Sequence, residues 1–170
     1  MIEDKDYPFH FTEDGLLNLV IKTALESTDE VRVGVVIANG GNVLVTAINE
    51  LPRGVHKTNE RVSEESKLGY TIHAELNAIA KAAREGITIA DTTMYVTGKG
   101  MCRHCALSVI QTGISKVVMP PPDDIGSWKD STHEAIVLLQ EAGVEVEITD
   151  RLRGTSHGLN NGEKWVRGFG

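Results

Sequence analysis

One arrangement recurs from residue 73 onward and restricts the fold more than any other feature of the chain. A helix of about a dozen residues ends at a glycine, and a short strand rich in β-branched residues follows. Helices that alternate with strands in this way form crossover units, which build an at least partly parallel sheet. The three copies are His73–Glu85 with strand Thr92–Val96, Cys102–Thr112 with Lys116–Met119, and Thr132–Ala142 with Val144–Ile148.

The first part of the chain adds a helix and a hairpin to this pattern. Residues 13–27 carry apolar side chains at helical spacing, and Thr12 can cap the helix that they predict. Residues 31–38 and 43–48 are apolar and β-branched, with a turn between them, which predicts a hairpin. We therefore expect an α/β fold, with a mixed five-stranded sheet and helices on both of its faces.

The length and apolar content of the chain are those of one domain. It has 170 residues, of which 41% are hydrophobic, enough to bury a sizeable core. We place this domain at residues 1–150. Residues 151–170 hold five glycines and little apolar content, so we expect a polar tail or an arm that docks elsewhere. The polar stretch from Glu50 to Lys67 predicts a long loop, which in a compact domain is usually functional or disordered.

Charge and cysteine content exclude several classes of protein. A formal net charge of −7 argues against binding of a nucleic-acid polymer, because phosphate backbones are held by basic surfaces. No apolar run is long enough to span a membrane, and the acidic start, residues 1–10, is not a signal peptide. Two cysteines three positions apart do not make a secreted disulfide framework. We expect a cytoplasmic protein.

Four residues carry the chemistry that the sequence indicates. Cys102 and Cys105 fall in the first turn of a predicted helix, where the helix dipole favours thiolates, the form that binds zinc. His73 opens another predicted helix and can supply a third ligand, which leaves the fourth position of a catalytic zinc for water. Glu75 lies two residues after His73 and can act as the proton carrier. The spacing matches the His-x-Glu and Cys-x-x-Cys signature of zinc nucleobase deaminases.

Two other functions fit part of this pattern. A Cys-x-x-Cys pair in an α/β chain can be a redox centre, in which case the protein would hold no metal and form a reversible disulfide. A zinc-bearing domain without activity is a further alternative, although it gives no reason for the carboxylate at Glu75. A structural zinc site needs four ligands, and the chain has no other cysteine.

At these residues the chain resembles the cytidine and deoxycytidylate deaminase superfamily, and most nearly its deoxycytidylate branch. The resemblance runs from about Arg32 to Ile148, and its most specific stretches are His73-Ala74-Glu75 and Cys102-Arg103-His104-Cys105. It implies a three-layer αβα fold, one catalytic zinc per chain, conversion of dCMP to dUMP, and a homo-oligomer. A deaminase of a free or modified cytidine, or of another base, is the alternative within this class.

The resemblance also implies residues that contact the substrate. The asparagine that matches Asn49 contacts the sugar and base in this family, and Ala74 lies in the stretch that shapes the base pocket. The family's base-stacking tyrosine is missing here, and Trp128 is the nearest aromatic residue that can replace it. Arg53 is our candidate for the phosphate contact, because a guanidinium can grip a phosphate with two hydrogen bonds.

One departure from the family concerns regulation. Deoxycytidylate deaminases that respond to nucleoside triphosphates carry Gly-Tyr-Asn-Gly where this chain has Ala47-Ile48-Asn49-Glu50. Glycine lets backbone amides approach a phosphate closely, and Glu50 would repel the triphosphate. We therefore expect weak or absent control by dCTP and dTTP.

Overall fold

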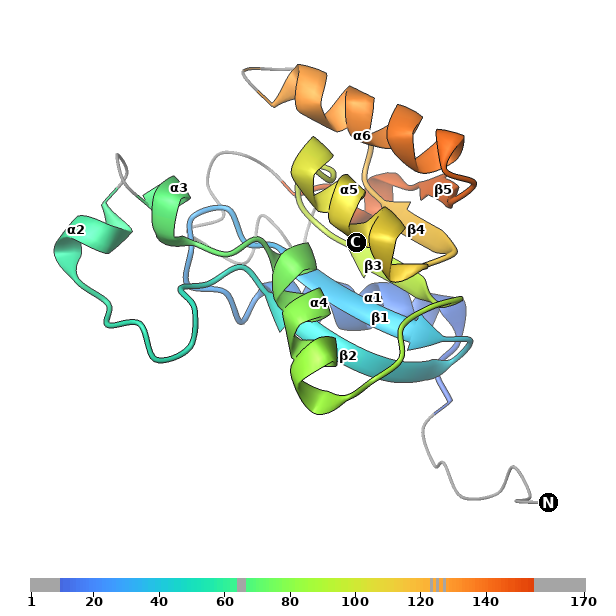
Figure 1. The fold of residues 1–170 in the computed structure, drawn as a ribbon, viewed down its shortest axis with the longest axis horizontal. Coiled ribbons are helices and arrows are strands. Elements are labelled where there is room, and N and C mark those ends of the chain that lie inside the picture. The colour runs from blue at the N-terminus through green and yellow to red at the C-terminus, as the bar shows by residue number, and fades with distance from the viewer. Residues whose placement is uncertain (1–9, 64–66, 123, 125, 127, 155–170) are drawn as a thin grey trace.

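A mixed five-stranded sheet forms the centre of the computed structural model, which describes residues 10–63, 67–122, 124, 126 and 128–154 (Figure 1). The strand order is β2-β1-β3-β4-β5. Strand β1 is antiparallel to both of its neighbours, whereas β3, β4 and β5 run parallel. The predicted α/β class and mixed sheet are thus confirmed. The strands are β1 (Gly34–Asn39), β2 (Asn42–Ile48), β3 (Thr93–Val96), β4 (Lys116–Met119) and β5 (Glu145–Ile148).

Helices cover both faces of the sheet, so the fold has three layers. Helix α1 (Glu13–Ala24) packs on one face, where its Leu16 and Val20 meet Val36 of β1 in a buried cluster. Helices α4 (Ala74–Glu85), α5 (Arg103–Thr112) and α6 (Lys129–Glu141) lie side by side on the other face, in front of the sheet in Figure 1. The larger core cluster lies between these three helices and the sheet. This arrangement is the αβα sandwich that the family resemblance implied.

The hairpin begins later than its apolar residues predict. Strand β1 starts at Gly34, three residues after Val31, because the side chain of Asn49 takes the place of a strand neighbour there. Its Nδ2 donates to the Val31 carbonyl at 2.7 Å, and its Oδ1 accepts from the Val33 amide at 2.9 Å. These bonds give the Val31 carbonyl and the Val33 amide partners outside the hydrogen-bond ladder of the sheet.

The helix boundaries agree with the sequence at glycines and differ elsewhere. Helices α4 and α5 end at Gly86 and Gly113, which have φ of 67° and 80°. Helix α1 ends at Ala24, three residues earlier than expected, because the next amides bond three residues back in a tightening turn. Helix α6 starts at Lys129, three residues before the expected Thr132.

Two segments expected to be irregular contain short helices. The stretch between Glu50 and Lys67 holds α2 (Asn59–Val62), and α3 (Lys67–Tyr70) follows it. A 3₁₀ turn, η1 (Asp150–Leu152), crosses the boundary at which we placed the tail, and its Leu152 is fully buried. The rest of that tail, residues 155–170, lies outside the described residues. None of the helices in the described part of the chain is long and apolar enough to cross a membrane.

Candidate metal centre and substrate pocket

Three helices begin close together at one edge of the sheet. His73 is the N-cap of α4, Cys102 is the N-cap of α5, and Trp128 is the N-cap of α6. Helix α5 follows directly on β3, and the carboxyl ends of parallel strands are where α/β folds place their ligands. Residues distant in sequence therefore meet where three positive helix ends converge.

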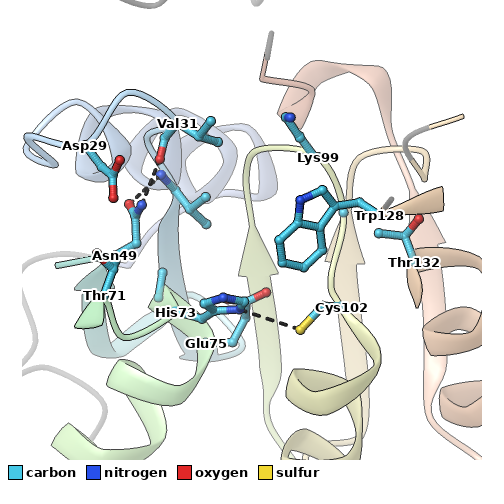
Figure 2. Close-up of a pocket in the computed structure, with 13 residues that line it drawn as sticks. Asp29, Val31, Asn49, Thr71, His73, Glu75, Lys99, Cys102, Trp128 and Thr132 are labelled. Atoms are coloured by element: carbon cyan, nitrogen blue, oxygen red, sulfur yellow. Dashed lines mark hydrogen bonds between the residues drawn. The ribbon is translucent and has the colours of Figure 1, made fainter. Parts of the chain in front are cut away.

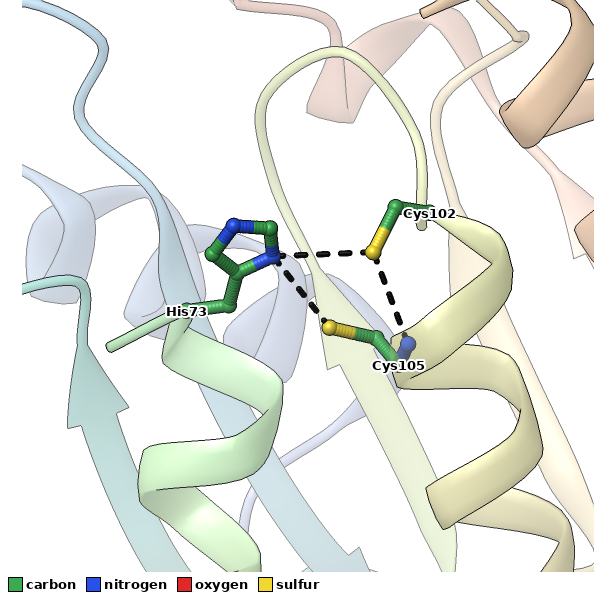
Figure 3. A group of neighbouring side chains, drawn as sticks. All are labelled: His73, Cys102 and Cys105. Carbon is green, nitrogen blue, oxygen red and sulfur yellow. Dashed lines mark hydrogen bonds between the residues drawn. The ribbon is translucent and has the colours of Figure 1, made fainter. Parts of the chain in front are cut away.

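The His73 Nδ1 atom and the sulfurs of Cys102 and Cys105 form one cluster (Figure 3). Nδ1 lies 3.3 Å from Cys105 Sγ and 3.6 Å from Cys102 Sγ, and all three atoms lie within 4.8 Å of one another. Zinc bonds of about 2.0–2.3 Å in tetrahedral geometry require nitrogen and sulfur ligands roughly 3.5 Å apart. The three residues can therefore hold a zinc ion with little movement, and no fourth protein ligand belongs to the cluster among the described residues.

Hydrogen bonds within the cluster shift the pKa values of the two thiols in opposite directions. A bond from the Cys105 thiol lowers the pKa of Cys102 to about 4, and a bond with His73 adds to this effect. The same bond raises the pKa of Cys105, which donates in it, and burial raises it further. The Cys102 sulfur also accepts a bond from the Cys105 amide at 3.4 Å, as expected at a helix start. A thiolate is thus favoured beside the imidazole, and thiolate is the metal-binding form.

Glu75 is a buried carboxyl group beside this cluster. Its side chain is 4% exposed, and burial raises its pKa, while the nearby His73 lowers it in part. A hydrogen bond with Cys105 also lowers it in part. A carboxyl group whose pKa is raised in this way is better able to hold and return a proton than an exposed one.

A pocket opens directly over His73, Glu75 and Cys102 (Figure 2). Its volume is about 140 Å³. An apolar cavity of about 150 Å³ holds benzene, so this pocket has room for one six-membered ring. The lining residues are Asp29, Val31, Val33, Asn49, Thr71, His73, Ala74, Glu75, Lys99, Gly100, Cys102, Trp128 and Thr132.

Three of the four predicted substrate contacts lie in this wall. The Trp128 ring faces His73, with the ring centroids 5.9 Å apart and the planes at 51°. Ala74 is fully buried at the start of α4. Asn49 also lines the pocket, although its amide binds the backbone of Val31 and Val33. An amide has two donors and two acceptor sites, so these bonds leave capacity for a ligand.

Arg53, the fourth predicted contact, does not line the pocket. It is exposed and belongs to another hollow, which Glu50, Lys81 and Arg84 also line. Conversely, Lys99 and Asp29 line the pocket over His73 and were missed from the sequence. Lys99 stands between two glycines just before the cysteine motif, and this was the only local signal that could have indicated it.

The geometry defines an α/β protein with a cluster of three side chains that could hold a metal ion, at the floor of a small pocket. The family model of the cytidine and deoxycytidylate deaminase zinc-binding region matches residues 12–120. The chain therefore belongs to the cytidine and deoxycytidylate deaminase family. Members of this family hydrolyse C–N bonds, so the predicted hydrolase class and family resemblance are confirmed, and the redox alternative is not supported.

Several deaminases resemble the chain in sequence. It is 34% identical to the "uncharacterized deaminase in luxG 3′ region" of Aliivibrio fischeri, over 68% of this chain and 77% of that protein. It is 32% identical to a probable deoxycytidylate deaminase of Caenorhabditis elegans, over 75% and 71% of the two chains. The deoxycytidylate deaminase of phage T2 is 44% identical, but the match covers 44% of this chain and 37% of the phage enzyme.

A solved structure supports the fold. The dCMP deaminase of cyanophage S-TIM5, crystallised with dCMP and dUMP, superimposes with a TM-score of 0.69. The match covers 82% of this chain and all of the phage chain at 24% sequence identity. At that identity the likeness establishes the shared αβα architecture alone.

Proposed function

We propose that this chain is a zinc-dependent deaminase of a cytosine nucleotide, with conversion of dCMP and water to dUMP and ammonia as its main reaction. The observation that carries the proposal is the His73, Cys102 and Cys105 cluster at the floor of a pocket with room for one pyrimidine ring. Relatives named deoxycytidylate deaminase support dCMP as the substrate. A homo-oligomer in the cytoplasm remains the expectation from the sequence.

The metal is assigned by the chemistry of its ligands. Two sulfurs and one imidazole nitrogen, with a fourth position left to water, are a ligand set that catalytic zinc uses. Zinc held by these three residues would lower the pKa of a bound water and so would supply hydroxide near neutral pH.

Glu75 carries the protons of the proposed reaction. Its carboxylate accepts a proton from the attacking water, passes it to the ring nitrogen of the cytosine, and helps the amine leave as ammonia. The carbon–oxygen bond forms first, while the ring nitrogen takes up the water's first proton through Glu75. The remaining hydroxyl proton then passes to the amine, the carbon–nitrogen bond breaks to release ammonia, and no redox partner is needed. Trp128 packs against the face of the base, Ala74 shapes the edge of its site, and Asn49 contacts the sugar.

The test is a comparison of four substrates with a metal assay on the same preparation. Ammonia release is measured from dCMP, CMP, deoxycytidine and cytidine, and zinc is measured by elemental analysis after purification without chelator. We expect about one zinc per chain and the highest kcat/KM with dCMP. A preparation without zinc would contradict the metal assignment. A preference for either nucleoside would instead identify a nucleoside deaminase with the same chemistry.

A further inference from the structure

The loop from β3 to α5 carries a lysine into the wall of the substrate pocket. This loop contains Gly98-Lys99-Gly100, and its glycines have φ of 109° and 94°. Few other residues adopt such angles, so the course of the loop on both sides of Lys99 depends on glycine. Lys99 itself is half-buried and lines the pocket together with His73 and Trp128.

The end of the described chain holds this loop in place. The Gly98 amide donates to the Leu152 carbonyl at 3.0 Å, and the Gly98 carbonyl accepts from the Gly154 amide at 2.6 Å. Leu152 is fully buried, so these bonds attach the loop to the core. On the other side of Gly98, a Cβ atom would lie 3.1 Å from Val33. The backbone beside Lys99 is therefore fixed, while its long side chain can adjust to a ligand.

The charges of the surroundings favour an anion on the Lys99 side of the pocket. Lys99 is the only Lys or Arg among the described residues that line it. Asp29 lies on the opposite side in Figure 2, and it also lines an adjoining hollow with Glu30, Glu50 and Lys57. That hollow has three carboxylates against one lysine, so it would repel a phosphate.

The position of Lys99 also suits the shape of a nucleotide. In Figure 2 its amino group lies beyond the Trp128 ring, on the side away from Cys102. A base whose reacting carbon lies over the metal cluster and whose face lies against Trp128 would direct its sugar away from that floor. A 5′-phosphate would then come within reach of the Lys99 ammonium, a compact charge with three donors.

We propose that Lys99 binds the phosphate of the substrate and thereby makes the enzyme selective for a cytosine nucleoside monophosphate over the free nucleoside. The phosphate contact that the sequence suggested for Arg53 is thus assigned to Lys99, which lines the pocket itself. This inference rests on the proposed deaminase function and specifies the substrate class of that same site.

The test compares dCMP with deoxycytidine in matched variants. Lys99→Met removes the charge but retains the apolar stem, Lys99→Arg retains a charge, and Lys129→Met removes a charge from an exposed position that does not line the pocket. We expect Lys99→Met to lower kcat/KM for dCMP roughly 10- to 100-fold and to change that for deoxycytidine less than about twofold. Lys99→Arg should recover most of the dCMP activity, and Lys129→Met should alter neither substrate.

Binding of the product gives a second measurement that does not depend on turnover. Inhibition by dUMP should weaken in Lys99→Met by a factor similar to the loss in kcat/KM, while inhibition by deoxyuridine stays unchanged. Equal losses for dCMP and deoxycytidine would overturn the inference, and so would a selective loss of dCMP activity in Arg53→Ala with none in Lys99→Met. Failure of the unmodified protein to release ammonia from either compound would instead refute the proposed function.

Discussion

Glu75 combines two properties that rarely occur together in a carboxyl group. Its side chain is 4% exposed, and yet it borders a pocket that a polar ligand can enter. Burial raises the pKa of Glu75 and also lowers the stability of the fold, because a buried carboxylate loses its hydration. The proposed role of Glu75 in exchanging protons during turnover would account for this cost.

Glu75→Gln should keep the fold and the bound metal but lose activity. The amide has nearly the same shape as the carboxyl group but cannot accept the proton of the attacking water. We expect kcat to fall by about two to four orders of magnitude. Steady-state rates with dCMP check this, with zinc content and thermal melting as controls. Near-normal turnover in a zinc-loaded Glu75→Gln protein would contradict the proton-carrier role.

Trp128 should act on substrate binding rather than on the metal. Its ring packs beside His73, and stacking of a base on an aromatic face is worth about 1–3 kcal/mol. Trp128→Ala should therefore weaken dUMP binding roughly 5- to 150-fold, while Trp128→Phe retains part of the affinity. The inhibition constant of dUMP, measured in competition with dCMP, gives the affinity of both variants. Loss of zinc from Trp128→Ala would show that the ring supports the metal cluster instead.

At the scale of secondary structure, the contact between α1 and β1 is unusually close. A Cβ atom added to Gly34 would lie 2.5 Å from the Ala24 amide nitrogen and 2.7 Å from the Val20 carbonyl oxygen. Both neighbours are backbone atoms, which cannot rotate away as a side chain can. The end of α1 thus packs directly against the start of β1, the strand that follows the segment held by Asn49 at Val31 and Val33.

Gly34→Ala should destabilise the protein by more than the small volume of the added methyl group suggests. The added methyl group forces apart two packed backbones, and overpacking of this kind costs about 1–3 kcal/mol. Gly69→Ala is the matched control, because a Cβ there meets nothing within 4 Å and alanine favours its helix. Denaturant unfolding should show a large loss of unfolding free energy for Gly34→Ala and none for Gly69→Ala. Equal stability of the two variants would mean that the sandwich tolerates this shift.

At the scale of the whole molecule, the pocket over His73 shares no lining residue with the charged hollow that contains Arg53. That hollow is lined by Ala47, Ile48 and Glu50, together with the cations Arg53, Lys81 and Arg84. The Glu50 carboxylate accepts a bond from the Asn77 amide at 3.1 Å, and the Lys81 ammonium donates to the Thr46 carbonyl at 3.2 Å. Glu50 and Lys81 thus already have partners within the chain.

We expect dCTP with magnesium to activate the enzyme weakly or not at all. Glu50 places a negative charge where a triphosphate would need to approach the backbone, and Ala47 replaces a flexible glycine. Rates over a range of dCMP concentrations, with and without dCTP, check this. A sigmoidal curve that dCTP makes hyperbolic would contradict it. Activation that emerges only in Glu50→Gln would show that the carboxylate is what excludes the triphosphate.

The short-range features of the protein could be predicted from the sequence. Glycine after a helix and alternation of helices with β-branched strands led to β3, β4, β5 and the helices α4 and α5. Two apolar runs on either side of a turn led to the hairpin, and together these patterns gave the class of fold. His73, Cys102 and Cys105 could be selected as one group because metal ligands must be of certain types at certain spacings. Local chemistry governs each of these features, so a single chain suffices to infer them.

The charged part of the pocket wall was decided by tertiary structure alone. Asp29 and Lys99 come from separate segments, and no spacing rule relates them before the sheet brings those segments to one edge. Arg53 shows the converse, because it lies four residues from Asn49 and yet lines a different hollow. Which charge faces a ligand depends on the path of the whole backbone, whereas which residues can bind a metal depends on their side-chain chemistry.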